Sequence, residues 1–159
     1  MKDRRKTAAQ MICWLLVAAC LMLIFGFSGQ DGDASHGVSL RVTRALLRLL
    51  GKGEMDVNGP AFLHAEYIVR KLAHACEYAL LSLLMLLTLS LYSLPQWNRM
   101  LIDYAGVLTV ACADEWRQSL TAGRYGMLED VGIDMLGAVV GAAFFFAAFR
   151  LFRGRLTKN

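Results

Sequence analysis

Four long apolar blocks constrain this chain more than any other feature of its sequence. They occupy residues 11–27, 72–94, 100–113 and 131–149. Because a helix needs about 20 residues to cross the roughly 30 Å hydrocarbon layer of a membrane, the first, second and fourth blocks predict membrane-spanning helices. The third block is shorter, but a helix there can continue to Leu120, and its neighbouring spans require the chain to cross back.

The composition agrees with a membrane protein. Of the 159 residues, 57% are apolar and 19% are charged, whereas soluble domains are nearer to 45–50% apolar and about 25% charged. We therefore expect an all-α membrane protein that forms one domain over residues 1–159. The expected fold is a four-transmembrane-helix bundle, with spans at about residues 8–27, 71–94, 100–118 and 131–150.

The first block has a second interpretation as a cleaved signal peptide. A basic stretch at residues 2–6 precedes it, and residues 26–28 have the small-residue pattern of a cleavage site. The apolar core of 17 residues is longer than is usual for a signal peptide, which favours an uncleaved span.

The orientation follows from the basic residues. They are densest beside the two chain ends, in residues 2–6 and 150–158, and Arg99 lies in the turn between the second and third spans. Because basic flanks favour the cytoplasm, we expect both termini to be cytoplasmic. Contacts of these residues with anionic lipid headgroups explain the net charge of +4. The sequence has no basic patch with interleaved aromatic residues, so no nucleic-acid partner is expected.

The segment between the first two spans, residues 28–70, would then be extracytoplasmic. A helix over His36–Leu50 would carry arginines on one face and apolar residues on another; these are Arg41, Arg44 and Arg48, and Val38, Val42, Ala45, Leu46 and Leu49. Such an amphipathic helix is typical of the membrane headgroup layer. A solvated linker helix without lipid contact has the same pattern.

The same segment contains signals for the end of one helix and the start of another. Gly51 and Gly53 are expected to end the amphipathic helix. The Asn-Gly-Pro sequence at residues 58–60 then predicts the start of a helix, because proline is tolerated in a first turn. We expect that helix to continue into the second span.

Polar residues gather near the predicted outer ends of the four spans. They are Ser28, Gln30, Lys71, His74, Glu77, Tyr78, Asp114, Glu115, Gln118, Arg124, Asp130 and Asp134. Ionisable residues within spans tend to face the bundle interior and to be functional, so these residues predict a site at one membrane face. Asp103 is the exception, because it lies toward the cytoplasmic end.

Helical spacing places several of these residues on common faces. Lys71, His74 and Tyr78 are three and four residues apart, so they form one stripe on a helix. Asp130 and Asp134 are four residues apart, and the glycines at 137 and 141 continue their face. Because small residues let helices approach closely, this face is expected to point into the bundle.

The ordered motifs of the chain resemble those of the VanZ-like family of small bacterial membrane proteins. The resembling pieces are Phe27-Ser28-Gly29-Gln30, residues 70–78 (RKLAHACEY), residues 114–118 (DEWRQ), Gly123-Arg124 and residues 130–137 (DVGIDMLG). The resemblance covers nearly the whole chain. It implies a four-span protein of the bacterial cytoplasmic membrane, and the founding member of the family is associated with low-level resistance to the glycopeptide antibiotic teicoplanin.

These observations lead to one principal hypothesis for function. The polar cluster would bind or modify an amphiphile, such as a lipid-linked envelope precursor or a lipoglycopeptide, with membrane lipids as the surrounding partners. Lys71 and Arg124, together with Arg70, would engage phosphate or carboxylate groups. His74 with Glu77 or Asp114 is the expected acid–base pair, because histidine titrates near neutral pH. The remaining residues of the cluster, Ser28, Gln30, Tyr78, Glu115, Gln118, Asp130 and Asp134, are expected to bind substrate.

Two other interpretations of the cluster remain open. In the first, the chain is a structural or partner-binding protein, and Lys71, Arg124 and His74 only neutralise the acids and lock the helices together. In the second, a metal ion held by histidine and carboxylates assists hydrolysis. The sequence has no compact ligand motif such as H-E-x-x-H, so no metal and no cofactor are expected. The four cysteines lack metal-ligand spacing and are expected to pack among apolar residues.

Overall fold

The computed structural model describes residues 2–29, 32–52, 55–121, 123 and 125–156, and these residues form helices and no strands. The helices are α1 (Lys2–Ser28), α2 (Gly32–Leu49), α3 (Pro60–Ser90), α4 (Gln96–Ser119) and α5 (Leu128–Leu156). The predicted all-α class is therefore confirmed.

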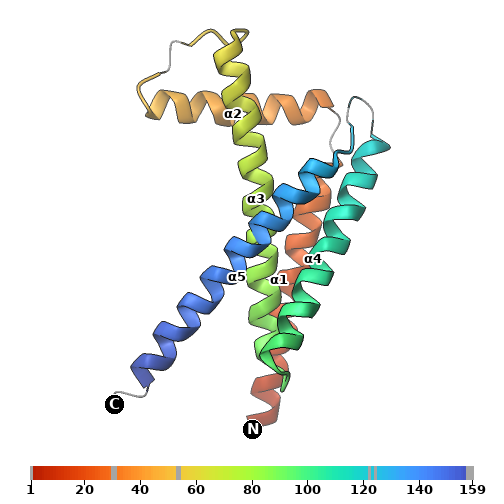
Figure 1. The fold of residues 1–159 in the computed structure, drawn as a ribbon, viewed down its shortest axis with the longest axis vertical. Coiled ribbons are helices and arrows are strands. Elements are labelled where there is room, and N and C mark those ends of the chain that lie inside the picture. Colours follow the sequence, from red (N-terminus) through yellow and green to blue (C-terminus); the bar gives the residue numbers. More distant parts are fainter. Residues whose placement is uncertain (1, 30–31, 53–54, 122, 124, 157–159) are drawn as a thin grey trace.

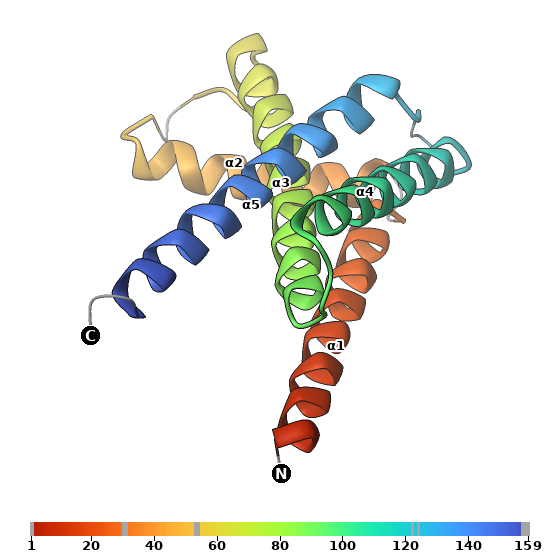
Figure 2. The same cartoon turned by 60° about the horizontal axis from the view of Figure 1, so that its bottom comes forward.

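Helices α1, α3 and α4 run roughly along the long axis of the molecule, and α5 runs obliquely to it, so the chain passes up and down in turn (Figure 1). Helix α2 lies across this direction at one end, and both chain termini lie at the other end (Figure 1). Helix α5 crosses α3 obliquely and diverges from α4 toward the C-terminus (Figure 2). The chain therefore passes from one end of the bundle to the other four times, in α1, α3, α4 and α5.

Three helices are long and apolar enough to cross a membrane. They contain the segments Arg4–Ser28, Pro60–Ser90 and Leu128–Leu151. Only 22%, 33% and 28% of their most apolar windows are buried inside the protein, so most of these side chains face outward, as a lipid-facing surface requires. Helix α4 does not meet the same criterion of length and hydropathy, because charged residues lower its mean hydropathy. A fourth span therefore stays a prediction.

The predicted helix boundaries agree with the structure at several points. Gly51 follows α2 with a φ of +72°, which a glycine adopts without strain. Pro60 occupies the first turn of α3, and that helix continues without a break to Ser90, as expected. Helix α2 begins at Gly32, earlier than the predicted His36. Gly53 lies outside the described residues.

The core is built on the crossing of α3 and α5, the most extensive contact between any two helices. A Cβ atom at Gly137 would overlap the carbonyl oxygen of Ala75, and one at Gly141 would overlap that of Ala79. The absence of side chains at these glycines lets the two backbones touch, as predicted from the spacing. The fully buried core residues around the crossing include Tyr78, Leu81, Val107, Ala111 and Ala138.

The cysteines follow the predicted packing role only in part. Cys20 is buried in the core, but Cys76 and Cys112 are exposed on the outer surface of their helices. The prediction assumed that small apolar residues turn inward, whereas a surface that faces lipid accepts them equally well.

Candidate functional site

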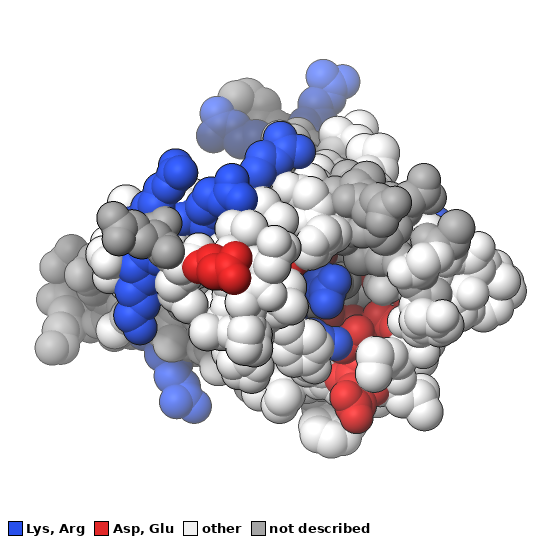
Figure 3. Space-filling view, turned by 90° about the horizontal axis from the view of Figure 1, so that it is seen from above, with Lys and Arg blue, Asp and Glu red and all other residues white. Residues whose placement is uncertain are grey.

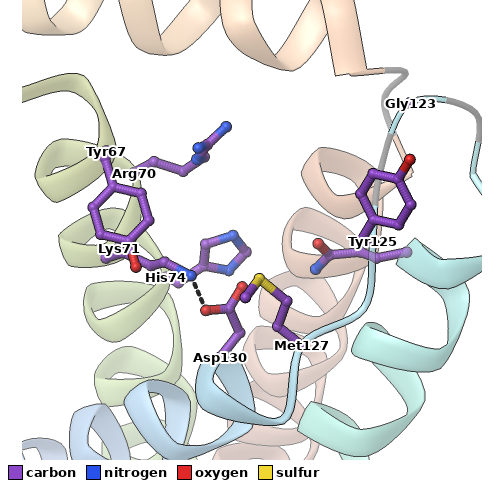
Figure 4. A pocket seen from close by; sticks show the side chains of 9 residues that line it. Tyr67, Arg70, Lys71, His74, Gly123, Tyr125, Met127 and Asp130 are labelled. Carbon is purple, nitrogen blue, oxygen red and sulfur yellow. Dashed lines mark hydrogen bonds and ion pairs between the residues drawn. The ribbon is translucent and has the colours of Figure 1, made fainter. Parts of the chain in front are cut away.

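A cavity of about 220 Å³ opens at the α2 end of the bundle, between α3 and the segment that joins α4 to α5. Its lining residues are Tyr67, Arg70, Lys71, His74, Gln118, Gly123, Tyr125, Met127 and Asp130. Five of these were predicted to take part in the site; they are Arg70, Lys71, His74, Gln118 and Asp130. The geometry of the cavity is shown in Figure 4.

One wall of the cavity belongs to α3. Tyr67, Arg70, Lys71 and His74 follow each other at helical spacing, so they project from one side of a continuous helix. Arg70 and His74 point into the cavity in Figure 4. The wall is therefore basic, and it rests on a helix that is held along its length by the crossing with α5.

The opposite wall comes from the end of α4, the connecting segment and the first turn of α5. Gln118 lies near the end of α4, and Tyr125 lies in the connecting segment, across the cavity from α3 (Figure 4). The backbone N–H of Met127 donates a hydrogen bond of 2.8 Å to Oε2 of Glu115, which fixes the segment against α4. Gly123 has a φ of +73°, which allows the chain to turn there.

An ion pair joins the two walls. The Nζ atom of Lys71 contacts Oδ1 of Asp130, and both side chains are only 13% exposed. The same ammonium group lies 5.1 Å from the ring centroid of Tyr67, close enough for a cation–π contact. This pair connects α3 to the first turn of α5 beside the cavity.

Asp130 also belongs to an acidic cluster, which we define as Glu77, Asp114, Glu115, Asp130 and Asp134. The Nε2 atom of Gln118 donates hydrogen bonds to Oδ2 of Asp114 at 3.0 Å and to Oε1 of Glu115 at 3.1 Å. Asp134 interacts electrostatically with the other four carboxylates. These acids come from α3, α4 and α5, and they are among the polar residues that the sequence analysis expected at one site.

Several buried polar atoms of this region have no hydrogen-bond partner among the described residues. They are both carboxylate oxygens of Asp134, Oδ1 of Asp114 and the hydroxyl of Tyr78, and all three residues are fully buried. Tyr78 interacts electrostatically with the carboxylates of Asp114 and Asp134. An unpaired buried polar group costs free energy. The described side chains at this end of the bundle therefore leave some of their hydrogen-bonding atoms without partners.

Six predicted site residues that the structure describes do not line the cavity; they are Ser28, Glu77, Tyr78, Asp114, Glu115 and Asp134. Ser28 is buried at the end of α1 and does not line it. Gln30 and Arg124 lie outside the described residues. The end of α1 is held instead by Arg117, whose Nη1 donates to the backbone carbonyl of Phe25.

The sequence analysis missed the aromatic residues of the cavity. Tyr67 precedes Lys71 by four residues, so the spacing of the α3 stripe contains a signal for it. Tyr125 and Met127 belong to a segment without helical periodicity, and the sequence contains no comparable signal for them.

The sequence analysis also missed another buried carboxylate, that of Glu66, which joins α2 to α3. Glu66 is 4% exposed, and its Oε1 lies 2.7 Å from Nδ1 of His36. The hydroxyl of Ser39 donates to the same oxygen. Because Glu66 lies one turn before Arg70, these contacts hold α2 close to the basic wall of the cavity.

Asp103 forms a separate polar pair in the interior. Its Oδ2 accepts a hydrogen bond of 2.7 Å from the hydroxyl of Ser82, and both residues are fully buried. This pair joins α3 to α4. It does not line the cavity, in agreement with the prediction that Asp103 stands apart from the cluster.

Within the described part of the chain, no group of three or more histidine, cysteine, aspartate or glutamate side chains has a geometry that could hold a metal ion. The acidic cluster is thus spread over three helices rather than focused on one point. Chemically, the cavity can bind an anion through its basic wall and a hydrogen-bond donor through its opposite wall.

Comparison with known proteins gives one match. The model of the VanZ/LLP1 family matches residues 13–152. No curated protein and no solved structure matches the chain. The matched region includes the cavity, the acidic cluster and the crossing of α3 and α5.

Proposed function

The chain belongs to the VanZ-like family, and from this premise we propose that its cavity binds an amphiphilic cell-envelope lipid or lipoglycopeptide. The founding member of the family is associated with teicoplanin resistance, which directs attention to envelope components. The single observation that carries the proposal is the cavity itself, in which Arg70, Lys71 and His74 share one wall.

The chemistry of the basic wall suits an anionic headgroup. Arginine and lysine form charge-assisted hydrogen bonds with phosphate and carboxylate groups. The guanidinium of Arg70 points into the cavity beside the imidazole of His74 (Figure 4). A phosphate held between these two groups would lie near the opening, where a lipid headgroup can reach it.

The surroundings of the cavity suit the apolar part of an amphiphile. Helix α2 exposes Val38, Val42 and Leu46, and α3 exposes Ile68 and Leu72. These residues lie on the two helices that Glu66 holds together beside the cavity. Acyl chains can lie against this surface while the headgroup occupies the cavity.

We propose that α4 is the fourth span and that the cavity faces the extracytoplasmic side. The 24 residues of α4 give a helix of about 36 Å at 1.5 Å per residue, long enough to cross the hydrocarbon layer. The basic clusters near both termini support a cytoplasmic location of the chain ends. A fluorescent-protein fusion at the C-terminus that does not fluoresce in intact cells would contradict this orientation.

For a modifying reaction, we propose His74 as the acid–base group. It lines the cavity, and histidine is the side chain that most often transfers protons in catalysis. Glu77 and Asp114 are the carboxylates proposed to orient it or to share its proton. A change in the mass of a bound lipid during incubation would reveal such a reaction, and a His74→Gln variant should abolish the change.

A second candidate function is structural, and a specific observation favours it. Lys71 and Asp130 pair across two helices, and Gln118 bridges Asp114 and Glu115. These contacts could serve only to hold the bundle together. In that case, substitutions in the cavity would reduce stability and function in proportion.

The test is native mass spectrometry of the purified protein. We expect the wild type to retain a lipid and a Lys71→Ala/His74→Ala variant to lose it. A Lys52→Ala/His64→Ala variant is the matched control, because both residues are exposed and neither lines the cavity. Retention of the lipid by the Lys71/His74 variant, with an unchanged melting temperature, would contradict the proposal.

A further inference from the structure

The two walls of the cavity have opposite chemical character. The α3 wall carries Arg70, Lys71 and His74, whereas the facing wall carries Gln118, Tyr125 and Asp130. Seen from the α2 end, Lys and Arg side chains spread over one side of the surface, and most Asp and Glu side chains in view gather beside the hollow (Figure 3). A ligand that fills the cavity therefore meets a basic side and an acidic, aromatic side.

The facing wall is built to accept hydrogen bonds rather than to donate them. The amide nitrogen of Gln118 already donates to Asp114 and Glu115. Its amide oxygen is the group that can serve a ligand, and oxygen only accepts. Asp130, the ion-pair partner of Lys71, likewise presents carboxylate oxygens that accept hydrogen bonds. The complementary ligand group on this side is an N–H donor.

The carboxylate on this side suits a positively charged donor. Among the described residues, the five carboxylates of the acidic cluster have a direct ion pair only with Lys71. Asp134 lies at the centre of the cluster, fully buried, with neither carboxylate oxygen hydrogen-bonded to a described residue. A positive group placed at the facing wall is attracted by the carboxylate of Asp130, which lines that wall.

The aromatic rings add a second reason for a cation. Tyr67 already accommodates the ammonium of Lys71, 5.1 Å from its ring centroid. Tyr125 lies across the cavity, with its side chain at the rim (Figure 4). Tyrosine rings attract ammonium groups through their quadrupole, so Tyr125 can hold a second ammonium opposite the first.

The size of the cavity restricts the ligand to a small headgroup. Its volume of about 220 Å³ is below the roughly 300–1,000 Å³ of cavities that enclose drug-sized molecules. The cavity therefore has room for a phosphate and a short aminoalkyl group, and the rest of an amphiphile must lie outside.

We propose that the cavity recognises a zwitterionic headgroup in which a phosphate is joined to a primary ammonium, as in phosphoethanolamine. The phosphate lies against Arg70 and His74, and the ammonium lies against Gln118, Tyr125 and Asp130. This inference rests on the proposed function and narrows its ligand class. A trimethylammonium group cannot donate hydrogen bonds to Gln118 and Asp130, so a phosphocholine headgroup is disfavoured.

The experiment compares three lipids that differ only in their headgroups. The full-length protein in detergent receives an equimolar mixture of phosphatidylethanolamine, phosphatidylglycerol and phosphatidylcholine with the same acyl chains, and native mass spectrometry counts the bound species. We expect phosphatidylethanolamine to be enriched about fivefold over phosphatidylglycerol, which has no ammonium group, as one cation–π contact of about 1 kcal/mol produces. We also expect it to be enriched over phosphatidylcholine, whose trimethylammonium group has no N–H to donate to Gln118 and Asp130.

Two variants locate the two halves of the headgroup. Arg70→Ala should lower the binding of phosphatidylethanolamine and phosphatidylglycerol alike, because both contain the phosphate. Tyr125→Leu should remove the preference for phosphatidylethanolamine and leave the binding of phosphatidylglycerol unchanged. A loss of selectivity in Arg70→Ala together with full selectivity in Tyr125→Leu would overturn the assignment of the two walls.

Soluble competitors separate headgroup recognition from recognition of the whole lipid. Displacement of phosphatidylethanolamine by phosphoethanolamine, but not by inorganic phosphate, supports the proposal. Equal displacement by inorganic phosphate overturns the ammonium subsite. Equal binding of all three lipids overturns this inference and leaves the proposed function standing, whereas the absence of any bound lipid overturns both.

Discussion

The crossing of α3 and α5 and the cavity at the α2 end use the same two helices in opposite ways. At the crossing, the glycines of α5 press on the backbone carbonyls of α3, and apolar side chains fill the space around them. At the cavity, both helices carry charged groups, and one turn along α5 from Asp130 the buried oxygens of Asp134 have no hydrogen-bond partner among the described residues. The first region is optimised for packing, and the second is not.

This difference indicates how the molecule divides stability and binding. Close packing at the crossing fixes the geometry of α3 and α5, so the side chains of the cavity keep their positions although their own contacts are incomplete. Substitutions at the crossing should therefore change stability. Substitutions at the cavity should change ligand binding beyond any effect on stability, and this is where the binding and structural proposals differ.

The largest effect on stability is expected when α3 and α5 are forced apart at their crossing. In a Gly137→Ala/Gly141→Ala variant, both new methyl groups overlap backbone carbonyl oxygens of α3, which cannot move away without a shift of the helix. We expect a loss of about 4 kcal/mol, near 2 kcal/mol for each overpacked site. Thermal unfolding in detergent, followed by tryptophan fluorescence, measures it.

Gly132→Ala is the matched control for the crossing. Gly132 lies on the same helix, and an added Cβ there has nothing within 4 Å. This variant should melt at or above the temperature of the wild type, because alanine favours a helix over glycine by about 1 kcal/mol. If the double variant melted like the control, the two helices could not be in the close contact described here.

A smaller effect on stability is expected from the ion pair of the cavity. Lys71→Met leaves the carboxylate of Asp130 largely buried without its partner, which should cost about 3 kcal/mol. A Lys71→Met/Asp130→Leu variant removes both charges and should recover most of that loss. Melting temperatures of the two variants provide the comparison.

The same pair of variants separates binding from structure. Under the proposed function, the double variant recovers its stability but not its bound lipid, because Lys71 and Asp130 both line the cavity. Under the structural alternative, recovery of stability restores function as well. A stable double variant that retains the lipid at the wild-type level would therefore favour the structural interpretation.

The buried pair of Ser82 and Asp103 should behave like the crossing rather than like the cavity. Ser82→Ala removes the only hydrogen bond that the Asp103 side chain makes among the described residues, at a cost of about 1–2 kcal/mol. Lipid binding should not change, since neither residue lines the cavity. Ser90→Ala is the control, because its hydroxyl donates within its own helix, to the carbonyl of Leu87. A loss of lipid in Ser82→Ala at unchanged stability would extend the binding region into the bundle interior.

The sequence predicted the parts of this architecture that depend on periodicity. The stripe of Lys71 and His74 and the common face of Asp130, Asp134 and the glycines are properties of single helices, so spacing alone defines them. The sequence analysis also predicted that these residues lie near one another. The predicted spans alternate in direction, so the residues at their outer ends were expected at one membrane face.

The sequence could not predict features that depend on contacts between distant segments. Glu66 lies before the apolar block of α3, where an exposed position was the natural expectation, and only the docking of α2 buries it. Tyr125 lies at the rim of the cavity because of the turn near Gly123 and the hydrogen bond between Met127 and Glu115. Neither contact has a periodic signal in the sequence.

The smallest effect on stability, and the most specific effect on binding, is expected at Tyr125. Its side chain lies at the rim of the cavity, and the residue is 86% exposed, so Tyr125→Leu should change the free energy of unfolding by less than about 0.5 kcal/mol. The loss of the ring should nevertheless lower the affinity for an ammonium-bearing headgroup by about fivefold, the effect of one cation–π contact. Titration of the protein with phosphatidylethanolamine, read by native mass spectrometry, measures the change.

Tyr125→Phe distinguishes the ring from the hydroxyl. Phenylalanine keeps an aromatic face of similar size, so this variant should bind phosphatidylethanolamine within about twofold of the wild type, because the quadrupole of the ring persists. If Tyr125→Phe lost affinity as fully as Tyr125→Leu, the hydroxyl would be the group that contacts the ligand. The facing wall would then act through a hydrogen bond at its rim, and the ammonium would have to be held by Gln118 and Asp130 alone.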